Sequence, residues 1–210
     1  LVHRDIKPSN IFSCRLGLEV DFVKVLDFGL VKAVGEGERE ATLLTAPDST
    51  TGTPAYIAPE MVRGDRVPDH RVDIYTLGCV GYWLLTGRLV FQAPNAIQLM
   101  YQHANAQPVP PSERSELEIS PALDQVILAC LAKQPEDRPQ SAAELSRLLQ
   151  AAAPSEAWSA ERAHRWWDRH LPEGSVHHRP DGDRKFLAKT MDVAWSPADS
   201  PSEELSSTAS

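Results

Sequence analysis

The sequence has 210 residues, and the 42% that are hydrophobic can form one substantial core with a polar tail. Its formal net charge of −8 argues against a surface that binds nucleic acid or anionic lipid, because such a surface needs a basic face. The most apolar run, residues 74–85, is too short to span a bilayer, so we expect no membrane segment in this chain.

The cysteines indicate a reducing compartment. Cys14, Cys79 and Cys130 lie far apart and form no C-x-x-C pair. An odd, scattered set is typical of reduced thiols and not of a disulfide framework or a zinc site. We therefore expect a cytoplasmic protein.

The first half of the chain predicts a hairpin, a long loop and a buried helix. Short β-type runs at residues 11–14 and 22–26 flank Gly17, which favours a turn. From residue 27 to about residue 67 the sequence shows no sustained period, and a loop of this length is usually functional or disordered. Residues 72–86 are apolar nearly all round, which predicts a buried central helix.

Three further helices are expected between residues 96 and 152. Residues 96–103 form a short amphipathic pattern, and Ser120 with Pro121 is typical of an N-cap and the first helical position. Ser141 and Glu144 match a capping box, in which each residue bonds the backbone of the other. The apolar stripe that follows consists of Leu145, Leu148, Leu149 and Ala152.

The C-terminal part changes in composition after Pro154. Residues 156–171 are expected to form one more helix, which either covers the compact part or docks a partner. Its large aromatic residues are Trp158, Trp166 and Trp167. The remaining residues are polar and acidic, as in disordered tails. We therefore expect a compact domain, a helical extension and a disordered tail at residues 1–152, 153–171 and 172–210.

Three short motifs occur in order: HRDIKPSN at residues 3–10, DFG at residues 27–29 and APE at residues 58–60. On these motifs the chain resembles the eukaryotic-like serine/threonine protein kinases, whose signature is H-R-D-L-x-x-x-N, D-F-G and A-P-E. Ile6 replaces the leucine of that signature. The resemblance covers residues 1–152 and implies an α+β, protein-kinase-like fold, here the mainly helical C-lobe with a small β-hairpin.

The resemblance also implies a reaction, the transfer of the ATP γ-phosphate to Ser or Thr hydroxyls of protein substrates. Asp5 matches the catalytic-loop aspartate that accepts or orients the hydroxyl proton, and Lys7 matches the lysine placed near the transferring phosphate. Asn10 and Asp27 match the ligands of Mg²⁺. Lys7 and Thr53 resemble the residues found at these positions in serine/threonine kinases, so we expect specificity for Ser or Thr and not for Tyr.

Other positions match the scaffold of the family. The resemblance pairs Glu60 of the APE motif with Arg138, and it makes Asp73 the residue that hydrogen-bonds the catalytic-loop backbone. A lone carboxylate in so apolar a helix needs such a partner. The remaining scaffold positions are His3, Phe28 and Gly29.

Regulation by phosphorylation is expected in the loop before Gly52. In this family the arginine that precedes the catalytic aspartate, here Arg4, often pairs with a phosphorylated loop. The hydroxyl residues of this loop are Ser49, Thr50, Thr51 and Thr53. We expect phosphorylation on Thr50 or Thr51 to activate the complete enzyme, the alternative being that the cluster reflects loop composition alone.

The sequence contains no Gly-rich loop, no V-A-I-K lysine and no matching helix glutamate, so the N-lobe is absent from it. We therefore expect this chain to be a piece of a longer protein and to be inactive alone. A pseudokinase or C-lobe remnant that acts as a protein-binding platform is the alternative, although the intact Asp5, Asn10 and Asp27 speak against it. A third alternative, a phosphate-binding regulator that transfers no phosphate, would need an anion-binding Gly-rich loop, and this sequence has none.

Overall fold

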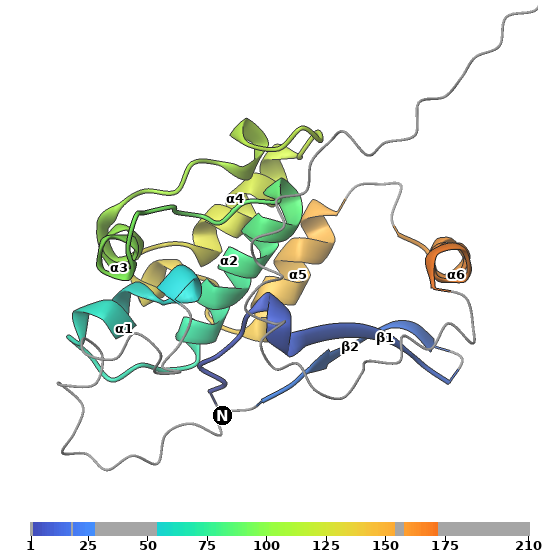
Figure 1. Cartoon of the computed structure of the whole chain (residues 1–210), viewed down its shortest axis with the longest axis horizontal. Helices are drawn as coiled ribbons and strands as arrows, with labels where there is room; N and C mark the ends of the chain where they lie inside the picture. Colours follow the sequence, from blue (N-terminus) through green and yellow to red (C-terminus); the bar gives the residue numbers. More distant parts are fainter. Residues whose placement is uncertain (1, 18, 28–53, 154–157, 172–210) are drawn as a thin grey trace, which may run out of the picture. The chain divides into compact units, whose positions relative to one another are not determined.

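The structure is a computed structural model of the chain, and it describes residues 2–17, 19–27, 54–153 and 158–171. Six α-helices accompany one two-stranded antiparallel sheet in these residues (Figure 1). The elements are β1 (Ile11–Leu16), β2 (Glu19–Val25), α1 (Pro59–Arg63), α2 (Arg71–Thr86), α3 (Ala96–Asn105), α4 (Pro121–Cys130), α5 (Ala142–Ala152) and α6 (Ala160–His170). The expected mainly helical fold with a small hairpin is confirmed.

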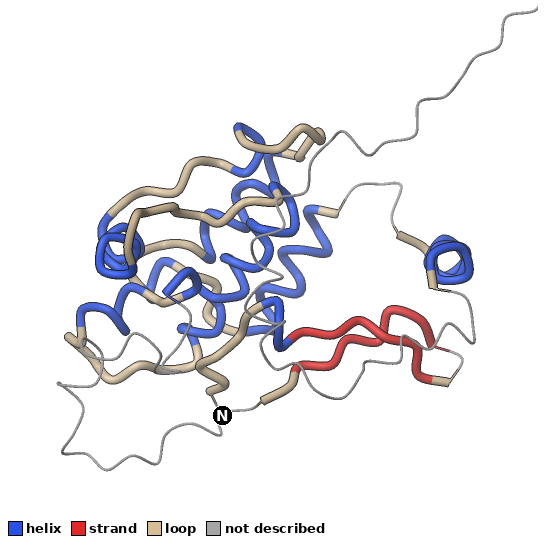
Figure 2. The backbone as a smooth tube through the Cα atoms, in the orientation of Figure 1, coloured by secondary structure: helices blue, strands red, loops and turns tan. Residues whose placement is uncertain are grey.

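The hairpin forms where the alternating runs predicted it, and the strands of the described chain are confined to it (Figure 2). Ile11 pairs with Val25 and Cys14 with Phe22, and the register shifts between Cys14 and Leu16. Gly17 has a φ of 61°, a left-handed value that costs glycine little. The two strands therefore return the chain to the end from which it started.

Helix α2 is the centre of the helical core. Tyr75, Cys79 and Tyr82 are at most 1% exposed. A Cβ atom on Gly78 would lie 2.6 Å from Cys130 Cβ, so this glycine allows the close approach of α2 to α4. The sequence predicts burial nearly all round this helix, but Leu84 in its last turn is 70% exposed.

Helices α4 and α5 begin at the predicted residues. The Ser120 hydroxyl accepts the N–H of Leu123, and that of Ser141 accepts the N–H of Glu144. The expected capping box is wrong in one half, because the Glu144 carboxylate accepts the N–H of Gln140 at 2.7 Å and not that of Ser141. The expected apolar stripe of α5 is also only partly buried.

The stripe of α5 divides into two groups. Leu145 and Ala152 are each 6% exposed and pack in the core with residues of α2 and α4. Leu148 and Leu149 are 38% and 37% exposed, so the face that they share is only partly covered in the described residues. Helical spacing groups these leucines, but burial depends on which elements lie opposite.

The predicted C-terminal helix is present as α6, which starts at Ala160 after the N-cap Ser159. The chain divides into units of residues 1–175 and 176–210, and every described element lies in the first. The predicted domain boundaries stay predictions, and the expected tail lies outside the described residues. None of the described helices has the length and apolar character that crossing a membrane requires.

Candidate active site

The segment that leads to Asp5 is held by a carboxylate from the first turn of α2. Asp73 Oδ2 accepts the backbone N–H of His3 at 2.7 Å, and its Oδ1 accepts that of Arg4 at 2.8 Å. Arg4 has a φ of 65°, a left-handed conformation that is uncommon outside glycine. The two hydrogen bonds stabilise this conformation, so Asp73 directs the chain into the turn that presents Asp5.

Asp5, Lys7 and Asn10 form one polar cluster after this turn. Lys7 Nζ lies 2.9 Å from Asp5 Oδ2. Asn10 Nδ2 donates to the backbone oxygen of Asp5 at 2.8 Å and to its Oδ2 at 3.0 Å. Because both partners are acceptors, the amide nitrogen must face Asp5, and Asn10 Oδ1 is the amide atom that can bind a cation.

The cluster is anchored on one side and open on the other. Asn10 is buried at 7% exposure, in the turn Pro8–Asn10 that leads into β1. The side chains of Asp5 and Lys7 are 36% and 24% exposed. The carboxylate and the ammonium are therefore accessible to a ligand while their positions are set by buried neighbours.

The hairpin places Asp27 at the same end as Asn10. Ile11 follows Asn10 and pairs with Val25, and the N–H of Leu26 donates to the carbonyl of Asn10 at 2.8 Å. Asp27 comes next, is exposed and has a φ of 60°. Two predicted ligands that are far apart in sequence are thus connected through one short ladder.

His3 joins the segment that contains Asp5 to the end of β2. Its ring is 5% exposed, Nδ1 accepts the N–H of Asp5 at 3.3 Å, and Nε2 lies 3.1 Å from the carbonyl of Leu26. Since Nδ1 accepts, Nε2 carries the ring proton and donates it to that carbonyl. The neutral imidazole therefore fixes Asp5 relative to the residue before Asp27.

The oxygen donors of this site fit a hard cation. The Asn10 amide oxygen and the Asp27 carboxylate are the kinds of ligand that Mg²⁺ takes. Among the residues that the structure describes, no group of at least three His, Cys, Asp or Glu side chains is arranged to hold a metal. A magnesium ion here would need further oxygens from water and phosphate, which is usual for sites that bind a nucleotide.

A small cleft lies beside the cluster. Its lining consists of residues 4–7 and 56–58 together with Met61, Val72 and Thr76. Burial raises the pKa of Tyr56 to about 12, so its hydroxyl stays neutral. Of the lining residues, sequence reasoning did not single out Tyr56 and Ile57, although their position just before the APE motif is a signal that would have found them.

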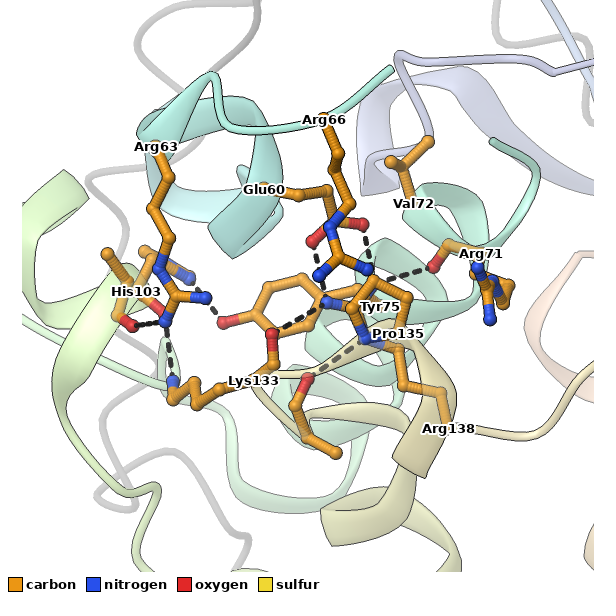
Figure 3. Close-up of polar contacts among 12 residues, drawn as sticks. Glu60, Arg63, Arg66, Arg71, Val72, Tyr75, His103, Lys133, Pro135 and Arg138 are labelled. Carbon is orange, nitrogen blue, oxygen red and sulfur yellow. Dashed lines mark hydrogen bonds and ion pairs between the residues drawn. The ribbon is translucent and has the colours of Figure 1, made fainter. Parts of the chain in front are cut away.

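Glu60 of α1 and Arg138 form a buried, bidentate ion pair (Figure 3). Arg138 Nη1 and Nη2 donate to the two carboxylate oxygens at 2.8 and 2.7 Å. Arg138 also donates to the carbonyls of Arg71 and Ala132, each at 2.9 Å. The pair therefore ties α1, and with it the wall of the cleft, to the start of α2 and the loop after α4.

A second buried polar network adjoins this pair, and sequence reasoning missed it. Tyr75 and His103 Nδ1 form a hydrogen bond of 2.8 Å, and Lys133 Nζ donates to the carbonyl of His103 at 2.9 Å (Figure 3). Burial lowers the pKa of His103 to about 4 and that of Lys133 to about 8. Lys133 also lies 4.7 Å above the Phe91 ring. No motif marks these residues.

Several predicted positions lie outside the described residues. They are Phe28, Gly29, Ser49, Thr50, Thr51 and Thr53. The polar cluster of Asp5, Lys7 and Asn10 consists of described residues alone.

Comparison with known proteins agrees with the motifs. The family described as the protein kinase domain matches residues 1–149. Serine/threonine-protein kinase pkn3 of Myxococcus xanthus is 41% identical over 152 residues, which are 72% of this chain and 27% of that protein. Serine/threonine-protein kinase PknB of Mycobacterium leprae is 43% identical over 145 residues, 69% of this chain and 22% of that protein.

A third relative, the probable serine/threonine-protein kinase CE0033 of Corynebacterium efficiens, is 39% identical over 167 residues, 78% of this chain and 24% of that protein. The chain thus spans about a quarter of the length of these relatives. Because the family match covers most of the sequence, the chain belongs to the protein kinase family.

Proposed function

We propose that this chain is the C-lobe of a serine/threonine protein kinase, and that the whole protein transfers the γ-phosphate of ATP to Ser or Thr hydroxyls of protein substrates. One observation carries the proposal: Asp5, Lys7 and Asn10 form a single hydrogen-bonded cluster, and a short hairpin connects it to Asp27. The names of the relatives support the serine/threonine class.

Each residue of the cluster has a distinct role in this proposal. The Asp5 carboxylate orients the substrate hydroxyl and accepts its proton. Lys7, which lies 2.9 Å from that carboxylate, offsets negative charge on the transferred group. Asn10 Oδ1 and the Asp27 carboxylate hold Mg²⁺. When bound, Mg²⁺ neutralises the charge of the ATP phosphates.

The test is a phosphotransfer assay with Mg²⁺, ATP and Ser/Thr peptides on the whole protein that contains this chain. Asp5→Asn should lower turnover by about 10²–10⁴-fold, because the amide cannot accept the proton. Asp65→Asn, the same change on an exposed loop, should leave turnover unchanged. Full turnover by the Asp5→Asn protein would contradict the proposed role.

The 210-residue chain by itself should show no turnover above that of its own Asp5→Asn variant. Turnover that is lost in that variant would contradict this expectation. If the whole protein were inactive, and it and its Asp5→Asn variant bound a protein partner equally well, the binding-platform alternative would be favoured instead.

Arg4 and the loop before Gly52 support a proposal of regulation. A phosphate on Thr50 or Thr51 would pair with the exposed Arg4 guanidinium, and such charge-assisted bonds order activation loops. Replacing both threonines with Ala should therefore lower the activity of the whole enzyme. Full activity of the doubly substituted protein would exclude this role.

The partners proposed are ATP and proteins with accessible Ser or Thr. The net charge of −8 supports protein substrates over nucleic acid. The cysteines are free thiols, which supports a cytoplasmic location.

A further inference from the structure

Helix α6 lies beyond the part of the chain that matches the kinase family, yet it packs against β2 of the β1–β2 hairpin (Figure 1). Ala163 and Trp167 on its inner face are 2% and 7% exposed, whereas the neighbouring Trp166 is 43% exposed. The helix is strongly polar apart from these residues. Its burial is therefore specific to one face, and that face meets the hairpin.

The contact is centred on one carboxylate. Trp167 Nε1 donates to Asp21 Oδ1 at 2.6 Å, and Trp158 Nε1 donates to Asp21 Oδ2 at 2.5 Å. An indole can only donate and an ionised carboxylate can only accept, so the three groups are complementary. These two hydrogen bonds are the main cause of a lowered pKa of Asp21, which keeps the carboxylate ionised.

A second contact reaches the other strand. Arg15 on β1 forms an ion pair of 2.8 Å with Asp168, and its guanidinium lies 5.6 Å from the centre of the Trp167 ring. Asp21 is on β2, so α6 is bonded to both strands. Helix α6 therefore bridges the two strands across the hairpin.

The bridged hairpin connects the two residues assigned to the metal. Asn10 immediately precedes β1, and Asp27 lies two positions after β2. Anything that stabilises the pairing of the strands therefore stabilises the relative positions of these two side chains. The contacts of α6 with Asp21 and Arg15 lie nearer the other end of the hairpin, at residues that are not part of the proposed metal site.

We propose that residues 158–170 form a C-terminal strap that binds the hairpin at Asp21 through the two indole N–H groups and so restrains Asn10 and Asp27. The contacts with Asp21 and Arg15 support binding of the strap by themselves, whereas its consequence for catalysis rests on the proposed function. Asp21 is in this view a positioning residue, because it acts through the hairpin and touches no reacting atom.

The experiment is amide hydrogen exchange on the 210-residue chain without nucleotide. Trp167→Phe removes the indole N–H and part of the buried ring, and Asp21→Asn places an amide against two donors. Each should speed exchange in residues 11–25 and in α6 by about tenfold, the effect of losing one charge-assisted hydrogen bond. Exchange in α2 should not change.

Trp166→Phe is the matched control, since it makes the same change on the next residue of the same helix. It should leave exchange in the hairpin unchanged. If Trp167→Phe disturbs α2 as well, Trp158→Phe supplies the test, because its ring is 52% exposed and it loses one hydrogen bond with little packing. That variant should speed exchange in the hairpin severalfold.

The proposal is overturned if the hairpin exchanges at the same rate in the original chain and in the Trp167→Phe and Asp21→Asn variants, or if Trp166→Phe has an equal effect. The readout requires no phosphotransfer. The strap proposal can therefore be refuted even if the Asp5→Asn assay supports the proposed function. Conversely, a whole protein without phosphotransfer activity would not change the interpretation of the exchange result.

Discussion

The buried ion pair between Glu60 and Arg138 allows the sharpest test of how this fold is held together. The change is Glu60→Gln, which keeps the shape of the side chain and removes its charge. The side chains of Arg138 and Glu60 are 0% and 3% exposed, so water cannot take the place of the lost carboxylate. The guanidinium then stays buried without its counter-charge.

The size of the effect follows from what each partner retains. Removing one member of a buried pair costs roughly 3–5 kcal/mol, because the other charge is stranded. After Glu60→Gln, Arg138 still donates to the carbonyls of Arg71 and Ala132, which favours the lower value, about 3 kcal/mol. Arg138→Met also leaves those carbonyls without this donor, which favours the upper value, about 5 kcal/mol.

The assay is urea unfolding of the 210-residue chain at neutral pH, followed by circular dichroism. With the slopes usual for small domains, a loss of about 3 kcal/mol lowers the midpoint by about 1–3 M urea. The double variant Glu60→Leu with Arg138→Met should lose less than the sum of the losses from Glu60→Leu alone and Arg138→Met alone, because no unpaired charge remains.

The control is the exposed ion pair of Arg66 and Glu136, which has a similar separation of 2.8 Å with side chains 37% and 57% exposed. Glu136→Gln should shift the midpoint far less than Glu60→Gln, since solvent screens an exposed pair. Equal shifts from the two glutamine variants would refute the argument that burial makes the Glu60–Arg138 pair important.

Two further predictions concern the core around α2. The pKa of His103 is about 4 in the fold against 6.5 for the free side chain, so the unfolded chain binds more protons between these values and stability falls as the pH drops from 6.5 to 4. His103→Gln should flatten this part of the stability profile, and an unchanged profile would contradict the assigned burial. Gly78→Ala should cost about 1–3 kcal/mol of unfolding free energy, because the new Cβ would meet Cys130 Cβ at 2.6 Å. Gly81→Ala should cost less, because its contact is the movable end of Ile127 at 2.8 Å, and the reverse order in thermal unfolding would contradict the packing.

Local features of the fold were predictable because their causes lie within a few residues. The hairpin follows from alternation on either side of Gly17, and the starts of α4 and α5 follow from serines that accept backbone N–H groups three residues ahead. The family, and with it the set Asp5, Asn10 and Asp27, was readable from the order of short motifs.

Other features were not predictable from local pattern. Helical periodicity groups Leu148 with Leu145 on α5, but the structure covers only Leu145 well. The capping box failed because Glu144 found a different backbone N–H within reach. The local sequence could not distinguish a buried from an exposed Leu148, nor the N–H of Ser141 from that of Gln140 as the partner of Glu144.

The sequence alone was enough to recognise the family and to predict its site, with a carboxylate, a lysine and two oxygen ligands in the order of a protein kinase. No local pattern indicated that α6 bonds Asp21, 146 positions from Trp167, or that His103 stays neutral near pH 5; both follow from the folded structure. Hydrogen-bond partners, burial and pKa values all depend on atoms that approach one another through space. Sequence spacing constrains such approaches only where the chain between them is short.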